Sequence, residues 1–154
     1  MLSAPGADCL VDTNILLRSA GRLHGASAQA RTAMKVLFRR GDRLCVATQS
    51  LLEAWVVATR PRDVNGFGYT SQFAADGLSK LKRLFHVLAD TDDIYTEWER
   101  LVVAHQVMGK TAYDARLVAT MKVHGVSNIL TFNGDDFKRY KGIQVIHPSE
   151  CSGK

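Results

Sequence analysis

The stretch CLVDTNILLRS, Cys9 to Ser19, decides how the rest of the chain is interpreted. Residues 9–11 form a short apolar run that predicts a buried strand, and the run ends abruptly at Asp12. A helix is expected directly afterwards, capped by Thr13 or Asn14, because a short side-chain oxygen can accept a free N–H group of a first turn. Asp12 would then lie at the carboxyl end of a parallel strand, where open α/β sheets bind their ligands. This stretch alone leaves two interpretations open, a functional carboxylate and a simple capping residue.

The size and composition of the chain predict one globular domain. The chain has 154 residues, 46% of them hydrophobic, which is long enough to bury a substantial core. We expect a single domain over residues 1–154, with its core at about 9–148. The sequence contains no run of about 18 apolar residues, so no membrane span is expected.

The cysteines and the start of the chain favour a cytoplasmic location. Cys9, Cys45 and Cys151 are odd in number, and none has a Cys or His at a zinc-site spacing, which is typical of a reducing compartment. We interpret Cys9 and Cys45 as core residues and Cys151 as an exposed thiol of the tail. The first eight residues lack a basic start and an apolar core, so no secretion signal is expected.

Short apolar runs alternate with amphipathic helical patterns along the chain. This alternation predicts an α/β fold in which a parallel sheet is covered on both faces by helices. A loop is expected at 61–69, and Trp55 and Trp98 are interpreted as packing residues rather than platforms for nucleic-acid bases. The expected strands are 9–11, 43–47, 86–89, 127–132 and 143–148. One helix is expected to begin near residue 15, and further helices are expected at 26–40, 49–60, 70–85, 90–107 and 113–125.

Acidic and amide side chains recur where strands end, where a helix begins, or in unusually apolar surroundings. The set comprises Asp12, Glu53, Asp114, and Asn133 with Asp135 and Asp136. In a parallel α/β sheet these positions converge at the carboxyl edge. Carboxylates packed together repel one another and take up protons, whereas a hard divalent cation such as Mg²⁺ removes that penalty. Such an ion can also activate water for attack on a phosphate ester, so the pattern indicates a nuclease.

Two other classes of protein with acidic pockets fit less well. A dehalogenase-like phosphatase requires a second Asp two residues after its nucleophile, and Asn14 occupies that position here. A response-regulator receiver requires paired acids at the end of the first strand and a Lys after the last. Asp12 stands alone, and a later strand is followed by Asn-Gly-Asp-Asp.

Four segments, in this order and spacing, resemble the PIN-domain ribonucleases. They are VDTNILL (11–17), SLLEAWVVATRP (50–61), AYDARLVATMKVHGV (112–126) and ILTFNGDDF (129–137). The resemblance spans about residues 10–147 and is strongest to the VapC-like toxins of toxin–antitoxin pairs. It implies a three-layer α/β/α sandwich with a short, mostly parallel central sheet.

The resemblance also implies a set of metal ligands. Mg²⁺ or Mn²⁺ would be held by Asp12 and Asp114, with Glu53 binding directly or in the next layer around the ion. Where some members have a fourth acid, this chain has Asn133, and we choose Asp136 over Asp135 for that role. The polar residues expected to orient water or the acids are Thr13, Asn14, Thr131 and Asn133.

The function that the resemblance implies is a cytoplasmic, metal-dependent endoribonuclease, the toxin of a toxin–antitoxin pair. Water would attack the phosphodiester and leave 5′-phosphate and 3′-hydroxyl ends. The net charge of +5 agrees with a polyanionic partner without proving one. The basic residues expected to contact RNA are Arg60, Arg62, Lys80, Lys82, Arg83, Lys138 and Arg139. A binding module for RNA or protein that does not cleave, a phosphatase and a DNA nuclease remain open as alternatives.

The expected partners are RNA, a cognate antitoxin and a second copy of the chain. Antitoxins of this family commonly block the acidic pocket, and the toxins commonly form homodimers. Two predicted helices also carry more apolar side chains than a small sheet needs to cover itself. These side chains are Leu23, Met34, Leu37 and Phe38 on the first helix and Leu78, Leu81 and Phe85 on the second.

Overall fold

The computed structural model describes residues 2–20 and 25–152. Its strands are β1 (Asp8–Val11), β2 (Arg43–Ala47), β3 (His86–Leu88), β4 (Asn128–Leu130) and β5 (Gln144–Ile146). Its α-helices are α1 (Thr13–Ala20), α2 (Gly25–Arg39), α3 (Thr48–Thr59), α4 (Ser71–Leu84), α5 (Asp92–Ala104) and α6 (Thr111–His124). Three short 3₁₀ helices complete the fold, η1 (Arg62–Val64), η2 (Gly134–Phe137) and η3 (Pro148–Glu150).

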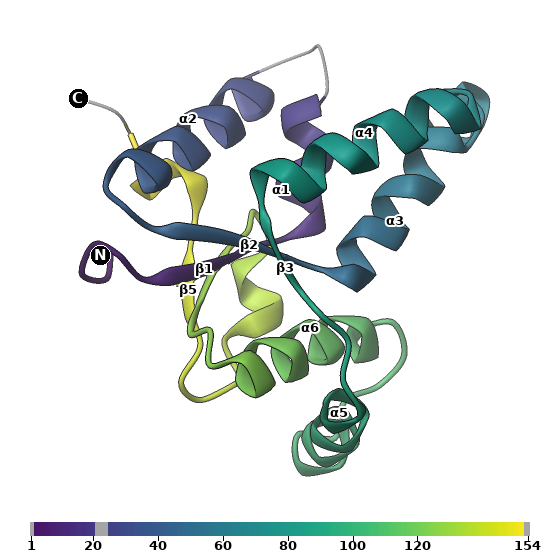
Figure 1. Ribbon diagram of the computed structural model, residues 1–154. Coiled ribbons are helices and arrows are strands. Elements are labelled where there is room, and N and C mark those ends of the chain that lie inside the picture. The colour runs from purple at the N-terminus through teal and green to yellow at the C-terminus, as the bar shows by residue number, and fades with distance from the viewer. Residues whose placement is uncertain (1, 21–24, 153–154) are drawn as a thin grey trace.

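The five strands form one parallel sheet in the order β3-β2-β1-β4-β5. Helices α1 to α4 lie on one side of the sheet and α5 and α6 on the other, as Figure 1 shows. The predicted α/β/α sandwich is confirmed, and every strand pair is parallel. β1 lies in the middle of the sheet, so the residue that follows it is at the centre of the carboxyl edge.

Alternate residues of the central strands lie in two separate hydrophobic cores, one on each face of the sheet. Leu10, Cys45 and Ile129 face the α5 and α6 side, where they pack with residues such as Leu117 and Met121. Their neighbours Val11, Val46 and Leu130 face the α1 and α2 side and pack with Ile15 and Leu37. Successive side chains of a strand point to opposite faces. When both faces are covered by helices, the central residues of the strand are therefore apolar at every position and not at every second one.

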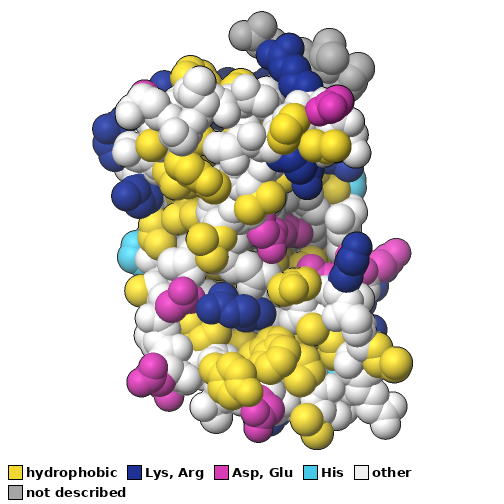
Figure 2. Space-filling model, turned by 90° about the vertical axis from the view of Figure 1, so that its right-hand side faces the viewer, with side chains coloured by type: hydrophobic (Ala, Val, Ile, Leu, Met, Phe, Trp, Pro, Cys, Tyr) yellow, Lys and Arg dark blue, Asp and Glu magenta, His cyan; other side chains and the backbone are white. Residues whose placement is uncertain are grey.

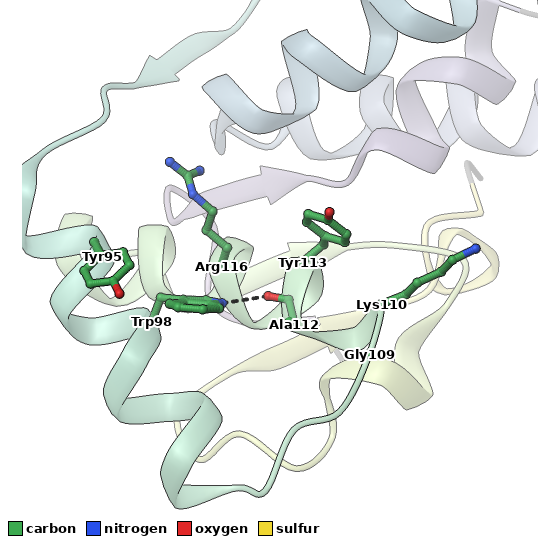
Figure 3. A pocket seen from close by; sticks show the side chains of 7 residues that line it. All are labelled: Tyr95, Trp98, Gly109, Lys110, Ala112, Tyr113 and Arg116. Carbon is green, nitrogen blue, oxygen red and sulfur yellow. Dashed lines mark hydrogen bonds between the residues drawn. The ribbon is translucent and has the colours of Figure 1, made fainter.

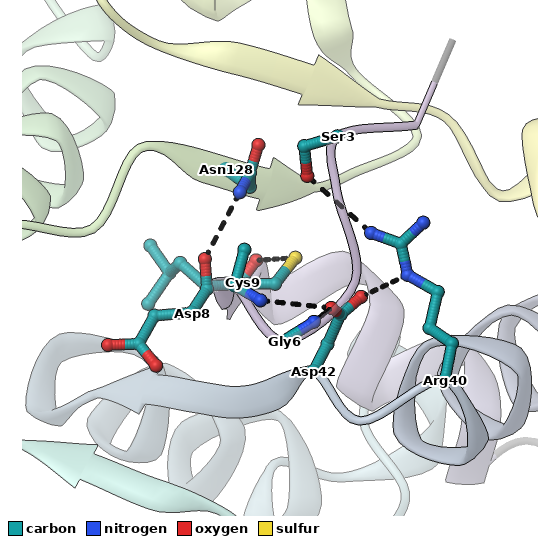
Figure 4. A network of polar contacts seen from close by, with 9 residues as sticks. Ser3, Gly6, Asp8, Cys9, Arg40, Asp42 and Asn128 are labelled. Carbon is teal, nitrogen blue, oxygen red and sulfur yellow. Dashed lines mark hydrogen bonds and ion pairs between the residues drawn. The ribbon is translucent and has the colours of Figure 1, made fainter.

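The amino edge of the sheet is fastened by Asp42, a buried carboxylate. It accepts hydrogen bonds from the backbone N–H groups of Gly6 (2.8 Å) and Ala7 (3.1 Å) and pairs with Arg40. Figure 4 shows these contacts joining the first turn of the chain to the end of α2. Gly6 has φ of 87°, a conformation that glycine adopts without strain. The network therefore fixes where β1 enters the sheet, on the side away from Asp12.

The structure corrects several local expectations. Thr13 and Asn14 do not cap α1: Thr13 is its first residue, and the Asp12 carbonyl accepts the N–H of Ile15 (3.0 Å). Cys151 is buried, not exposed, because η3 packs against α2. Helix α5 ends at Ala104, short of the expected 107, close to Gln106 with φ of 50°.

The apolar side chains that suggested a dimer differ in how far they are buried. Leu37 is buried in the core, whereas Phe38 is 70% exposed on the outer face of α2. Leu81 and Phe85 pack partly against the core. Leu23 lies outside the described residues. Within the described ranges, no helix is both long and apolar enough to cross a membrane.

Candidate functional site

Asp12 lies at the carboxyl end of β1, and its carboxylate is held by three donors. The backbone N–H of Thr13 (2.7 Å) donates to Oδ1, and the hydroxyl of Thr131 (2.7 Å) and the amide of Asn14 (3.3 Å) donate to Oδ2. The side chain is largely buried, with 8% of the residue exposed. The position and orientation of this carboxylate are therefore fixed by the protein.

Thr131 and Asn14 tie the ends of two neighbouring strands together. The Asn14 amide donates to the Thr131 hydroxyl oxygen (3.2 Å), which also accepts the N–H of Asn133 (3.0 Å). The side-chain oxygen Oδ1 of Asn14 accepts the backbone N–H of Phe132 (3.4 Å). Thr13 contributes only its backbone, and its buried hydroxyl has no hydrogen-bond partner within the part of the chain that the structure describes.

Gln49 links Glu53 to the start of α6. Its side-chain amide donates to Glu53 Oε1 (3.2 Å), one turn along α3, and to the carbonyl oxygen of Tyr113 (3.0 Å). Asp114 is the next residue, in the first turn of α6. The buried side chain of Gln49 thus links Glu53, which follows β2, to the turn of α6 that carries Asp114, on the opposite side of the sheet.

The acids are close enough to shift each other's pKa. Burial raises the pKa of Asp12, and the charges of Glu53 and Asp136 raise it further against the hydrogen bonds from Thr131 and Thr13. Burial, followed by the charges of Asp136, Asp12 and Glu53, raises the pKa of Asp114 to about 6. Figure 2, which looks onto the carboxyl edge, shows acidic side chains near the middle of this face. The edge is therefore a site of accumulated negative charge.

The structure separates the two candidates for the fourth acid. Asp136 interacts electrostatically with both Asp12 and Asp114. Asp135 instead pairs with Lys138 one turn away in the solvent, and this partner lowers the pKa of Asp135. The short η2 turn aims consecutive residues in different directions, so only Asp136 is placed with the cluster.

The chemistry of this set fits a hard divalent cation. All of its charged ligand atoms are carboxylate oxygens, and their mutual repulsion raises pKa values in the absence of a positive charge. In residues 2–20 and 25–152, however, no group of three or more His, Cys, Asp or Glu side chains is arranged so that it could hold a metal ion, so it is the kind of ligand atom that fits the cation and not the present spacing of the acids.

Comparison with known proteins gives the family. The sequence profile of the PIN domain matches residues 9–143, most of the chain. The chain belongs to the PIN domain family. No curated protein matches it.

Solved structures with the same fold come from toxin–antitoxin systems. VapBC2 of Rickettsia felis, bound to a promoter DNA fragment, has a TM-score of 0.69 at 10% identity over 91% of this chain and 98% of that one. A toxin–antitoxin complex of Klebsiella pneumoniae has a TM-score of 0.61 at 23% identity, over 91% and 97%. VapC20 of Mycobacterium tuberculosis, a toxin that cleaves the sarcin-ricin loop, has a TM-score of 0.63 at 17% identity, over 85% and 94%. At these identities the likeness establishes the fold.

Two polar residues of this PIN domain site were missed in the sequence. Gln49 is described above, and Arg116 donates to the side-chain oxygen Oε1 of Gln49 (3.4 Å) and to the carboxylate of Asp90 (3.1 Å), which follows β3. A Gln in the first turn of a helix carries no sequence signal of its own. Arg116 follows Asp114 by two residues on α6, a spacing that points the two side chains in different directions, so it carried no signal either.

The predicted RNA-binding residues of the PIN domain do not form one surface. Arg60 and Arg62 donate to the carbonyl groups of Asn65 and Phe67, and so they brace the loop after α3. Lys82 and Arg83 lie in the last turn of α4, before β3 begins, and therefore at the opposite end of the sheet from the acids. Lys80 lines an apolar groove along α4, Lys138 pairs with Asp135, and Arg139 donates to the carbonyl of His105.

Proposed function

We propose that this PIN domain is an endoribonuclease that depends on a divalent cation and acts as the toxin of a toxin–antitoxin pair in the cytoplasm. The observation that carries the proposal is the set of carboxylates at the carboxyl edge, with raised pKa values at Asp12 and Asp114. Burying several acids together destabilises a fold, and such perturbed groups cluster at functional sites. A protein that only bound RNA would gain nothing from acids that repel a phosphate backbone.

The residues that would hold Mg²⁺ or Mn²⁺ are Asp12, Glu53, Asp114 and Asp136. When bound, the ion supplies positive charge for the phosphate and activates water for attack on phosphorus. The protein contributes a carboxylate at Asp12 whose orientation is set in advance by Thr131, Asn14 and the N–H of Thr13. Gln49 holds Glu53 toward the start of α6.

The same arrangement determines the expected products. Attack by water does not involve the 2′-hydroxyl group of the substrate, so cleavage leaves 5′-phosphate and 3′-hydroxyl ends. The test is to incubate the purified protein with bacterial total RNA and Mg²⁺ or Mn²⁺, with and without excess EDTA, and to map the new ends. Cleavage that persists in EDTA, or that yields 2′,3′-cyclic phosphates, would contradict the proposal.

The toxin role is supported by the nature of the structural relatives. The proteins of Rickettsia felis and Klebsiella pneumoniae are toxin–antitoxin complexes, and the Mycobacterium tuberculosis protein is a toxin. By analogy we propose an antitoxin as partner for this chain. Expression of the chain alone should arrest growth of a bacterial host, and co-expression of a small protein encoded next to it should relieve the arrest.

A further inference from the structure

A hollow lies beside the acids, between α5 and the start of α6. It has a volume of about 560 Å³, and we call it the aromatic pocket. Figure 3 shows its lining side chains. They are Tyr95, Trp98, Lys110, Ala112, Tyr113 and Arg116, with Gly109. Arg116 lines the pocket and donates to the side-chain oxygen of Gln49, which in turn holds Glu53, so the pocket borders the acidic edge.

The indole of Trp98 forms a fixed wall of the pocket. Its Nε1–H donates to the carbonyl oxygen of Ala112 (2.8 Å), and one side of the ring packs against the core. The Tyr95 ring lies beside it, with the ring centroids 5.5 Å apart and an interplanar angle of 39°. Trp98 therefore is a packing residue, as predicted, but it also presents a surface to the pocket.

The two tyrosines of the aromatic pocket are unusually exposed. Tyr95 is 64% and Tyr113 65% exposed. Exposed hydrophobic side chains that are scattered singly need no explanation, whereas a contiguous exposed patch marks an interaction site. Here they gather within one hollow rather than being scattered, and Figure 2 shows hydrophobic side chains next to the acids on this face.

Positive charge accompanies these rings. Lys110 and Arg116 both line the pocket, and the hydrogen bonds of Arg116 to Asp90 and Gln49 hold its guanidinium at the border with the acidic edge. Aromatic faces together with cations are the combination that binds unpaired bases and their phosphates, because every base has a flat face that can stack. The carboxylates alone would repel the phosphate backbone of a nucleic acid, whereas Lys110 and Arg116 attract it.

We propose that the aromatic pocket binds one unstacked base of the RNA substrate, at or next to the phosphate that is cleaved. This inference rests on the proposed function and assigns the recognition of one unpaired base to this pocket. A base paired within a duplex is stacked on both sides and cannot enter the pocket. Tyr95 and Tyr113 supply stacking surfaces, and Lys110 and Arg116 contact the backbone.

The test uses Trp98 as the reporter. The chain has two tryptophans, so Trp55→Phe leaves Trp98 as the only one. In this background, and in EDTA, a 12-nucleotide oligoadenylate should quench Trp98 fluorescence saturably, whereas the same strand paired with oligouridylate should not. Tyr95→Ala should weaken binding of the single strand about tenfold, the loss typical of one stacked base. Tyr95→Phe, which keeps the ring, should restore it.

Phe38→Ala is the matched control, because Phe38 is an equally exposed ring on the distant helix α2. Equal affinity of Tyr95→Ala and Phe38→Ala for the single strand would overturn the proposal and would leave the pocket to a side chain of a protein partner. Equal binding of duplex and single strand would also overturn it. The RNA cleavage assay is independent of this binding test. If the protein binds the single strand but does not cleave RNA, the proposed nuclease function is wrong. If the protein cleaves RNA but Tyr95→Ala binds the single strand as tightly as the wild type, the proposed role of the aromatic pocket is wrong.

Discussion

Replacing Asp114 by Asn should stabilise the metal-free protein at neutral pH. The pKa of Asp114 is raised from the ordinary value of 3.8 to about 6 by burial and by the charges of Asp136, Asp12 and Glu53. The unfolded chain therefore ionises at a lower pH than the folded one, and the folded state loses stability as pH rises between these values. The destabilisation is absent below about pH 3.8 and complete above about pH 6.

The size of the effect follows from the pKa shift. The displacement from 3.8 to about 6 corresponds to about 3 kcal/mol at 1.36 kcal/mol per unit. Asp114 is only half-buried, so solvent screening reduces this to about 1–1.5 kcal/mol. For a domain of this size, such a gain raises Tm by roughly 3–5 °C. Asn keeps the volume of the side chain, and the change should act through charge alone.

The assay is thermal unfolding followed by circular dichroism in EDTA, at pH 7.5 and at pH 4. Asp114→Asn should have the higher Tm at pH 7.5, and the difference from wild type should shrink at pH 4. Asp135→Asn is the control, because Asp135 pairs with Lys138 outside the cluster. An Asp114→Asn protein with unchanged or lower Tm at pH 7.5, or with the same difference at both pH values, would refute the claim that the acids repel one another.

Three further outcomes are expected. Thr131→Val, which removes a donor to Asp12 and an acceptor for Asn14, should cost about 1–3 kcal/mol in chemical denaturation; an unaltered midpoint would contradict the role of this hydroxyl. Mg²⁺ or Mn²⁺ should raise the Tm of the wild type at pH 7.5, since a ligand that binds only the folded state stabilises it, and should do so less for Asp114→Asn. Light scattering at micromolar concentration should give about twice the chain mass of 17.0 kDa, whereas a monomeric mass across a wide concentration range would exclude a homodimer.

The strand-to-acid transition at Asp12 was predictable because it is local. An apolar run covered on both faces stays apolar until the strand leaves the core, so the first polar residue marks the edge of the sheet. Residues 9–11 and Asp12 obey this rule, and so do Ile129, Leu130 and Thr131, although β4 begins with the buried polar residue Asn128. The family match and the parallel sheet then followed from the order of such segments.

The remaining features depend on contacts between layers, which local patterns do not encode. Gln49 is a site residue only because α6 approaches α3. Asp135 and Asp136 are neighbours with opposite environments, set by the direction of the η2 turn. Cys151 is covered because η3 returns to α2. The prediction that Asn14 caps α1 was wrong, because the side chain of Asn14 forms a hydrogen bond with Thr131, the residue that follows β4.

The aromatic pocket illustrates the same limit. Trp98 was interpreted as a packing residue, and it does pack against the core. Its other surface borders a hollow that exists only because the loop before α6 places Ala112 and Tyr113 beside α5. The sequence shows which rings are present but not which of them share a cavity.

The most direct test of the central claim is the initial rate of RNA cleavage by Asp12→Asn beside the wild type and Asp135→Asn, all in Mg²⁺ or Mn²⁺. Circular dichroism should first show that each protein is folded. The account predicts that Asp12→Asn loses at least about 100-fold in rate, because even groups that merely support a metal ligand typically contribute 10–100-fold, and that Asp135→Asn cleaves like the wild type. A folded Asp12→Asn protein that cleaves RNA at the wild-type rate would contradict the account.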